Sequence, residues 1–234
     1  MPGARELGAR ELLAVWEQGS AQDPVRRALT MLVAVRGGTA GAAADLDVGS
    51  RDVLLARLLL AIAGGTIPAC ADCPACGTTL DVPVDVAAVA ALPVLEPGIR
   101  LTARSGGRKV TFRLPTTADL LSLRGGSYQQ ARAALLRRCL IDEAGPAALA
   151  AAEEAMERAA PAGAVDLLVC CPDCGQTAAL PLDIPALLWA EIQTRAALLL
   201  RDVHQLAASY GWSEADILAL SPSRRATYLA LALR

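Results

Sequence analysis

The chain has 234 residues, of which 54% are hydrophobic and 20% are charged, and its formal net charge is −2. This length and composition support a buried core in one domain or two small ones and exclude an intrinsically disordered chain. General nucleic-acid binders carry a basic surplus, which this sequence lacks. Aromatic residues make up only 3%, which argues against a base-stacking or carbohydrate-binding platform.

The N-terminal segment, residues 1–36, predicts two helices. Residues 4–19 have an amphipathic pattern. The candidate buried residues of this first helix are Leu7, Leu12, Leu13, Val15 and Trp16. Asp23 can cap a second helix that starts at Pro24 and ends near Val35.

Residues 45–95 predict a helix followed by a cysteine motif. The preceding residues 37–44, rich in glycine and alanine, predict a flexible linker. Ser50 is the candidate N-cap of the helix, and Gly64-Gly65 ends it. The motif Cys-Pro-Ala-Cys-Gly follows at residues 73–77.

An insert, residues 96–165, separates this motif from a second one. Residues 99–104 and 108–114 predict a β-hairpin with Ser-Gly-Gly at its turn. Two capped helices follow: a short one after Thr116 or Thr117, and a longer one after Ser127 that reaches about residue 143. Residues 147–159 are helical by propensity alone and predict a solvated, poorly ordered connecting helix.

The last segment, residues 166–234, begins with the second motif, Cys-Pro-Asp-Cys-Gly, at residues 171–175. Ile184-Pro185 then opens a long helix to about Tyr210, with Gly211 at its C′ position. Ser213 starts a capping-box sequence for a short helix, and Ser221-Pro222 starts the last one. The three predicted helices form one unit with tight turns.

The cysteines carry the strongest chemical signal. An odd number, seven, in a chain without a recognisable secretory signal does not indicate a disulfide framework. Two Cys-Pro-x-Cys-Gly knuckles instead supply the four thiolates of a closed tetrahedral site, which predicts one structural Zn²⁺. The predicted ligands are Cys73, Cys76, Cys171 and Cys174. Because four thiolates leave no position for water, the metal should be structural rather than catalytic.

The knuckles also begin an internal repeat. Residues 73–86 align without gaps to residues 171–184, and seven of the fourteen positions are identical. Each copy predicts a short strand and then a helix capped by Asp85 or Asp183. The simplest arrangement is two half-ribbons joined on one metal with approximate two-fold symmetry.

The other cysteines have plainer interpretations. Cys70 and Cys170 do not match under the repeat, so they are interpreted as spare thiols beside the site, although Cys170 could replace Cys171. Cys139 lies in a helical pattern and is interpreted as a small buried residue.

A candidate partner-binding surface lies in the C-terminal helices. Aromatic and arginine residues are typical interface anchors, although core packing explains about half of such a cluster equally well. The candidates are Trp189, His204, Tyr210, Trp212, Arg224, Arg225 and Tyr228. A DNA-reading helix-turn-helix is the alternative, with Arg224 and Arg225 in the first turn of the last helix. His204 is the single histidine, so any Ser-His-Asp or Cys-His enzyme would depend on it.

A family resemblance rests on several runs: Val203-His204, residues 210–214, Ile217-Leu218-Leu220, Arg224-Arg225 and Tyr228-Leu229. With these, the chain resembles phage baseplate proteins of the T4-type hub-assembly group, which also occur with contractile injection systems. Residues 50–125 and 165–232 share the likeness, most firmly the last seventy. The resemblance implies a baseplate component or assembly factor, with no catalytic residues, whose partners are baseplate hub, spike or wedge proteins.

Together these observations predict an α+β chain that is predominantly helical. It contains two zinc-knuckle half-ribbons on one structural zinc, a small β-hairpin insert and a C-terminal three-helix unit. The expected function is that of a non-enzymatic structural or assembly protein of a phage tail-like baseplate. The alternative is a zinc-ribbon adaptor for nucleic acid or transcription. The longest uncharged apolar stretch, residues 58–71, is too short and interrupted to span a bilayer. We therefore expect a cytoplasmic protein that has no membrane or small-molecule partners. The resemblance adds that it can be incorporated in a phage-like particle.

Overall fold

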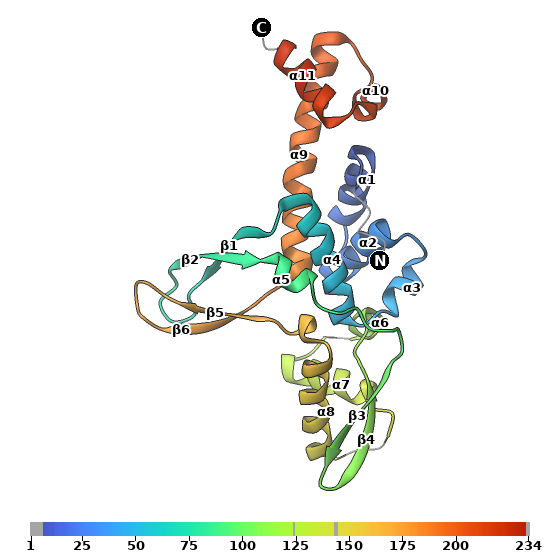
Figure 1. Ribbon diagram of the computed structural model, residues 1–234, viewed down its shortest axis with the longest axis vertical. Helices are drawn as coiled ribbons and strands as arrows, with labels where there is room; N and C mark the ends of the chain where they lie inside the picture. Colours follow the sequence, from blue (N-terminus) through green and yellow to red (C-terminus); the bar gives the residue numbers. More distant parts are fainter. Residues whose placement is uncertain (1–6, 124, 143–144, 233–234) are drawn as a thin grey trace.

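A computed structural model of the chain describes residues 7–123, 125–142 and 145–232, and it is elongated along its longest helix (Figure 1). The helices are α1 (Ala9–Ser20), α2 (Pro24–Arg36), α3 (Ala40–Ala44), α4 (Val48–Ala63), α5 (Val86–Ala90), α6 (Thr117–Ser122), α7 (Tyr128–Cys139), α8 (Pro146–Ala159), the 3₁₀ turn η1 (Pro161–Gly163), α9 (Ile184–Tyr210), α10 (Glu214–Ala219) and α11 (Pro222–Ala232). The strands are β1 (Thr66–Asp72), β2 (Thr79–Asp85), β3 (Arg100–Ser105), β4 (Arg108–Arg113), β5 (Asp166–Cys170) and β6 (Thr177–Pro181). The described part is thus mostly helical with small antiparallel strand pairs, β1–β2, β3–β4 and β5–β6, which agrees with the predicted α+β class.

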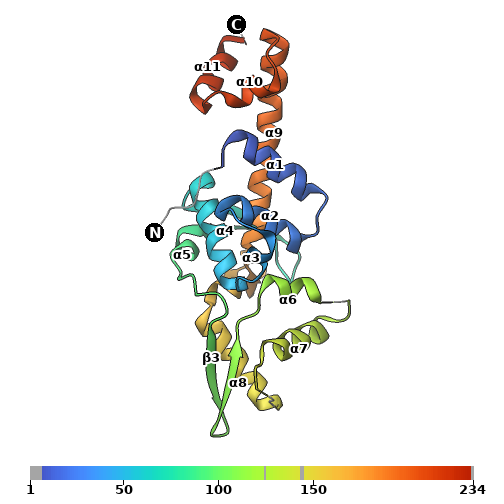
Figure 2. The ribbon, with the colours of Figure 1, turned by 90° about the vertical axis from the view of Figure 1, so that its right-hand side faces the viewer.

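The main core forms where α1, α2 and α4 pack around α9 (Figure 2). Apolar side chains repeat along α9 with helical spacing, and Leu188 and Ile192 are fully buried against Leu32 and Leu59 from α2 and α4. Each such side chain contributes roughly 1.5–3 kcal/mol of burial free energy. The N-terminal half of α9 is therefore fixed in the body, while its C-terminal end extends beyond it and carries α10 and α11 (Figure 2). The α10 helix still contacts α1, where the Arg10 side chain donates to the carbonyl of Ala215.

The first helix begins later than the sequence pattern suggested. The α1 helix starts at Ala9, and residues 1–6 lie outside the described part of the chain. Leu12, Leu13 and Val15 are buried as predicted, whereas Leu7 and Trp16 are half-buried.

The predicted linker at residues 37–44 is wrong over its second half, which forms α3. The Thr39 hydroxyl caps this helix by accepting the N–H of Ala42 at 3.2 Å, and Ala43 and Ala44 are buried. Alanine has the highest helix propensity, so a cap and a buried face suffice to order the run. Only Gly37 and Gly38 keep the left-handed backbone expected of a turn, with φ of 70° and 88°.

The predicted N-cap of α4 is also wrong by three residues. Asp47 is the cap, and its Oδ1 accepts the N–H of Ser50 at 2.9 Å. Ser50 lies in the first turn, is buried, and accepts the N–H of Leu95 at 2.8 Å with its hydroxyl. Both residues are good capping types, and the tertiary contact with Leu95 decides which one caps.

A glycine in α1 leaves room for the Trp189 side chain of α9. A Cβ atom built on Gly19 would lie 2.6 Å and 2.8 Å from two ring carbons of Trp189, whose face is covered by the guanidinium of Arg27 at 4.5 Å. We expect Gly19→Ala to lower the free energy of unfolding by about 1–2 kcal/mol, because the overpacking cost exceeds the gain in helix propensity.

The matched control is Gly41→Ala in α3, where the new Cβ would have no neighbour closer than 3.9 Å. That variant should be neutral or gain up to about 1 kcal/mol. Denaturant titration of the two variants checks both signs, and equal effects would contradict the proposed contact.

The insert packs a second, smaller core. Its β3–β4 hairpin is confirmed, with Gly106 and Gly107 at φ 55° and 79° in a turn of the type that suits tight hairpins. Thr116 and Ser127 cap α6 and α7 as predicted, but α7 ends at Cys139. The last residue of the predicted helix, residue 143, lies outside the described residues.

The expectation that α8 is a solvated connector is corrected by this core. Ala152 and Met156 on α8 are buried against Phe112 of the hairpin and Cys139 at the end of α7. One narrow apolar stripe on an alanine-rich helix is enough to dock it, although the rest of its surface is polar or small.

The C-terminal helices follow the predicted capping signals. The α9 helix ends at Tyr210, and Gly211 adopts φ 69° as a left-handed C-cap. The Ser213 hydroxyl accepts the N–H of Asp216, and the Ser221 hydroxyl accepts the N–H of Arg224. Over the described residues, none of the helices, α9 included, combines the length and apolar content that a membrane span requires.

Candidate metal centre

The two knuckles have the same backbone geometry. In the first, Cys73 N–H donates to the Thr78 carbonyl and Gly77 N–H to the Cys73 carbonyl, both at 2.8 Å. The same two bonds recur in the second knuckle at 2.9 Å, from Cys171 and Gly175. Gly77 and Gly175 have φ of 77° and 71°, which a side chain would oppose. The sequence repeat is therefore a structural repeat.

The knuckles lie at the tips of two neighbouring hairpins, β1–β2 and β5–β6 (Figure 1). After each hairpin an aspartate caps a helix, with Asp85 accepting the N–H of Ala88 at 3.1 Å and Asp183 that of Ala186 at 2.9 Å. The predicted caps are thus confirmed. Each half delivers one helix to the body, the short α5 and the long α9.

The four predicted ligand sulfurs converge. The Sγ atoms of Cys73, Cys76, Cys171 and Cys174 all lie within 4.8 Å of one another. The shortest contacts run between the knuckles, at 3.8 Å from Cys73 to Cys174 and 3.6 Å from Cys76 to Cys171. A tetrahedron of thiolates about 2.3 Å from a metal has edges of about 3.8 Å, so this cluster fits a single ion.

The cluster is half shielded. Cys73 and Cys171, the first cysteine of each knuckle, are buried against Leu80 and Val82 of β2. Cys76 and Cys174, the second of each, are exposed. This alternation repeats the sequence symmetry and leaves one side of the centre open to solvent.

The thiols strongly influence one another. Hydrogen bonds with the side chain and backbone of Thr78, and with Cys174, lower the pKa of the Cys76 thiol to about 6. The backbone N–H of Gln176 acts to lower the pKa of Cys174, but burial and the neighbouring sulfurs raise it to about 12. The Cys76 thiolate therefore forms easily, and its negative charge disfavours ionisation of the neighbouring thiol. Four thiolates this close require a cation to balance their charge.

One polar contact between the knuckles breaks their symmetry. The Thr78 hydroxyl donates to Oδ2 of Asp173 at 2.7 Å. Thr78 follows the first knuckle and Asp173 lies inside the second, and the equivalent positions, Gln176 and Ala75, cannot form the same pair. Sequence reasoning missed this contact, because nothing local marks either residue.

The remaining cysteines lie outside the cluster. Cys70 is exposed on β1 and contacts Asp81 at 3.5 Å, and Cys170 is exposed at the end of β5. Cys139 is fully buried in the insert, where burial raises the pKa of its thiol to about 11. The expectation of a small buried residue is confirmed for Cys139.

The predicted partner-binding residues are divided between separate places. Tyr210, Trp212 and Tyr228 form one cluster at the end of α9, with ring centroids 4.7 Å apart in the stacked Tyr210–Trp212 pair and 4.8 Å apart in the edge-on Trp212–Tyr228 pair. This cluster joins the end of α9 to α11, and Tyr210 remains 38% exposed. His204 and Arg224 are exposed as well.

Trp189 and Arg225 do not belong to that exposed surface. Trp189 lies in the main core beneath Arg27. Arg225 is 8% exposed, and its Nε donates to Oδ2 of Asp202 at 3.0 Å, which fastens α11 to α9. Both side chains serve packing in the isolated chain, so neither is available to a partner there.

Comparison of the chain with protein-family models, with curated protein sequences and with solved structures finds no match.

Proposed function

We propose that the chain is a non-enzymatic structural or assembly protein of the baseplate of a phage tail-like contractile injection system. In this proposal one Zn²⁺ joins the two knuckles, and the C-terminal helices contact a hub, spike or wedge protein. The mode of action is supported by the convergence of four thiolates from segments about a hundred residues apart. The baseplate setting is supported by the sequence resemblance alone.

Zinc is the proposed metal because four sulfurs at tetrahedral spacing favour Zn²⁺ or an iron–sulfur site, and two short knuckles are typical of zinc. With every coordination position filled by sulfur, such a centre has no open position for substrate. The role of the metal is then structural: the metal holds the two hairpins together and, because Asp183 follows the second hairpin and caps α9, it also fixes the start of α9.

The long α9 supports the idea of a presenting scaffold. Its first turns are anchored by the second knuckle and the main core, and its last turns carry the aromatic cluster of Tyr210, Trp212 and Tyr228. His204 and the apolar Leu200 are exposed on α9 below this cluster. A rigid helix places these side chains at a fixed distance from the metal centre.

The alternative, a nucleic-acid adaptor, loses one of its two proposed phosphate contacts. Arg225 is buried and paired with Asp202, which leaves Arg224 as the exposed arginine of that turn. Few phosphate contacts give weak and strongly salt-dependent binding. This observation favours the protein-contact proposal.

The test is sedimentation of a lysate from the native host with the chain tagged at its native level. We expect the tag in the sheath-containing fraction, or in a lighter fraction together with hub or spike proteins identified by mass spectrometry. Arg224→Glu on the presented surface should reduce this association, whereas Arg104→Glu, an exposed arginine on β3, should not. A tag that travels with no particle component would contradict the proposal.

A further inference from the structure

The β3–β4 hairpin has one free edge. Its two-residue glycine turn sets Ser105 opposite Arg108. In a hairpin with such a turn this first pair is hydrogen-bonded, and hydrogen-bonded and non-hydrogen-bonded pairs then alternate along the strands. Every second residue of β3 therefore directs its backbone N–H and C=O groups away from β4. These outward-facing residues are Arg100, Thr102 and Arg104.

The corresponding edge of β4 is already covered. The N–H of Thr111 donates to Oδ2 of Asp142 at 2.7 Å, and the carbonyl of Thr111 accepts the N–H of Ile141 at 3.0 Å. These bonds agree with a register that directs the backbone of Thr111 outward, like that of Thr102 directly opposite. No such bond reaches the three outward-facing residues of β3 from any other described residue. In Figure 2, β3 borders the hairpin on its open side, α8 lies behind the hairpin, and α7 lies on the side of β4.

The outer face of the same hairpin is basic. The register sets Arg100 opposite Arg113 and Arg104 opposite Lys109, and each of these residues is at least partly exposed. Like charges directly opposite each other on one sheet face repel and cost stability. Two such pairs on one short hairpin therefore favour a binding role for the basic face.

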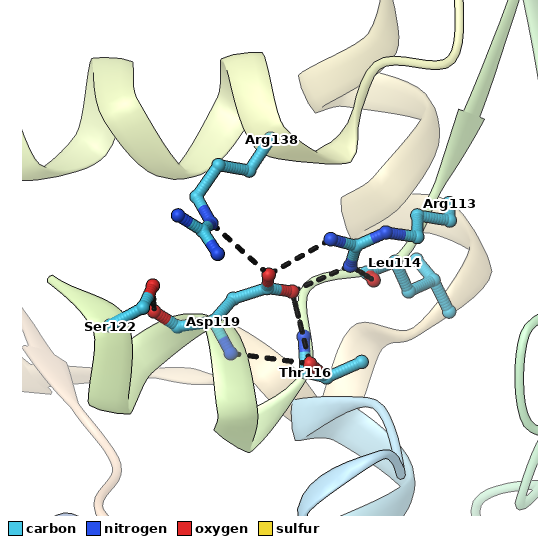
Figure 3. Close-up of polar contacts among 6 residues, drawn as sticks. All are labelled: Arg113, Leu114, Thr116, Asp119, Ser122 and Arg138. Carbon is cyan, nitrogen blue, oxygen red and sulfur yellow. Dashed lines mark hydrogen bonds and ion pairs between the residues drawn. The ribbon is translucent and has the colours of Figure 1, made fainter.

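Only part of this charge is neutralised within the chain. Arg113 donates from Nη1 and Nη2 to the two carboxylate oxygens of Asp119, at 2.5 Å and 2.8 Å (Figure 3). The charge of Lys109 interacts with Asp142. The two arginines of β3 have no hydrogen bond or ion pair within the described part of the chain. Free cations and free backbone groups thus occur at the same positions of β3.

These features fit an extended peptide better than a nucleic acid. A peptide strand offers both N–H and C=O groups to a sheet edge, whereas a phosphate backbone offers acceptors only. An antiparallel strand added to β3 places every second side chain beside Arg100, Thr102 and Arg104 on the basic face. Glutamate or aspartate at those positions can accept charge-assisted hydrogen bonds from the guanidinium groups.

We propose that β3 is a strand-addition site for an extended acidic segment of a partner protein. The inner face of the hairpin is fixed, because Ala103 and Phe112 are buried against Ala152 and Met156 of α8. The edge is thus preformed, and binding has to order only the incoming segment. Figure 1 places the hairpin and α11 at opposite ends of the molecule, so this site is separate from the C-terminal surface and does not depend on the proposed baseplate function.

The test is a titration of the full-length protein with the peptide acetyl-Ser-Glu-Val-Glu-Val-Glu-Ser-amide at low salt, followed in NMR spectra. We expect saturable shifts and slower hydrogen exchange at the amides of Thr102 and Arg104. The amides of Leu101 and Ala103 already face β4 and should change less. The same peptide with Gln in place of each Glu should bind about tenfold more weakly, because it loses the ion pairs.

Backbone methylation of the peptide tests the strand geometry. In the antiparallel pairing, the N–H groups of the peptide glutamates point to β3 and those of its valines point to solvent. N-methylation of the central Glu should therefore weaken binding about tenfold, whereas N-methylation of a Val should change it by less than about twofold.

Two variants separate this site from the C-terminal surface. Arg104→Glu turns the repulsive pair with Lys109 into an attractive one, so this chain should unfold at the same or a higher denaturant concentration. It should bind the acidic peptide about tenfold more weakly and still sediment with the particle. Arg224→Glu on α11 should keep its affinity for the peptide and show reduced association with the particle.

Equal binding of the acidic and glutamine peptides, equal effects of the two methylations, or shifts that map away from β3 would overturn the inference. Unchanged affinity in a folded Arg104→Glu chain would do the same, as would an oligothymidylate that binds as tightly as the acidic peptide. Absence of peptide binding would also overturn it, and would leave protection of the edge against aggregation as the role of these arginines. Peptide binding by a chain that sediments with no particle component would contradict the proposed function and support this inference alone.

Discussion

Cys171→Ser is expected to lose the bound metal and to destabilise the fold broadly. Cys171 is buried in the cluster, and its Sγ lies 3.6 Å from that of Cys76 across the two knuckles. Structural zinc contributes on the order of 10 kcal/mol to folding in small peptide sites. We expect the hairpins β1–β2 and β5–β6 to separate and the start of α9 to lose its support.

Cys170→Ser is the matched control, because it changes the adjacent residue, which is exposed and outside the cluster. It should retain one metal per chain and unfold at the same denaturant concentration as the parent chain. Metal content and denaturant titration of the two variants test whether Cys171, and not Cys170, is a metal ligand. Equal metal loss in both would show that the ligand assignment is wrong.

Asp119→Asn is expected to lower the free energy of unfolding by about 3 kcal/mol at neutral pH. The Asp119 side chain is 5% exposed and holds the partly exposed Arg113 of β4 to the first turn of α6, so the substitution removes the charge partner of that guanidinium at a buried carboxylate position (Figure 3). Arg138→Gln is the control: its side chain is 51% exposed and its contact is 3.4 Å, so we expect a change below about 1 kcal/mol.

The effect of Asp119 should depend on pH with a defined sign. Burial acts to raise the pKa of Asp119, but hydrogen bonds from Arg113 and Thr116 outweigh it and place the pKa well below its usual range. The folded pKa is therefore lower than the unfolded value of about 3.9, so the stabilisation is present above that pH and declines as the pH falls toward the folded pKa. Unfolding free energies of parent and Asp119→Asn chains should converge in strong acid. A constant difference down to pH 2 would contradict the assignment.

The parts of the fold that the sequence predicted are those fixed by local chemistry. Cysteine spacing identified all four members of the sulfur cluster, and Asp85 and Asp183 were recognisable as caps because they precede a proline-containing or apolar helical start. The glycines of the hairpin turn and the glycine after α9 were equally readable, since their backbone conformations suit glycine.

The errors arise where contacts distant in sequence decide the outcome. Ser50 is as good a cap as Asp47, and its contact with Leu95 from another segment places it inside α4. Arg225 was interpreted as an exposed residue because its acceptor, Asp202, lies on a different helix. Similarly, α8 gains its buried stripe only because the β3–β4 hairpin and the end of α7 come together beside it.

Zinc binding by the two knuckles is measured most directly by native mass spectrometry of the purified chain together with elemental analysis of its metal. We predict a species of 24.2 kDa plus one zinc ion per chain, from which a chelator removes the metal and leaves four free thiols. A metal-free chain with a disulfide between the knuckles, or an iron–sulfur cluster in place of zinc, would contradict it.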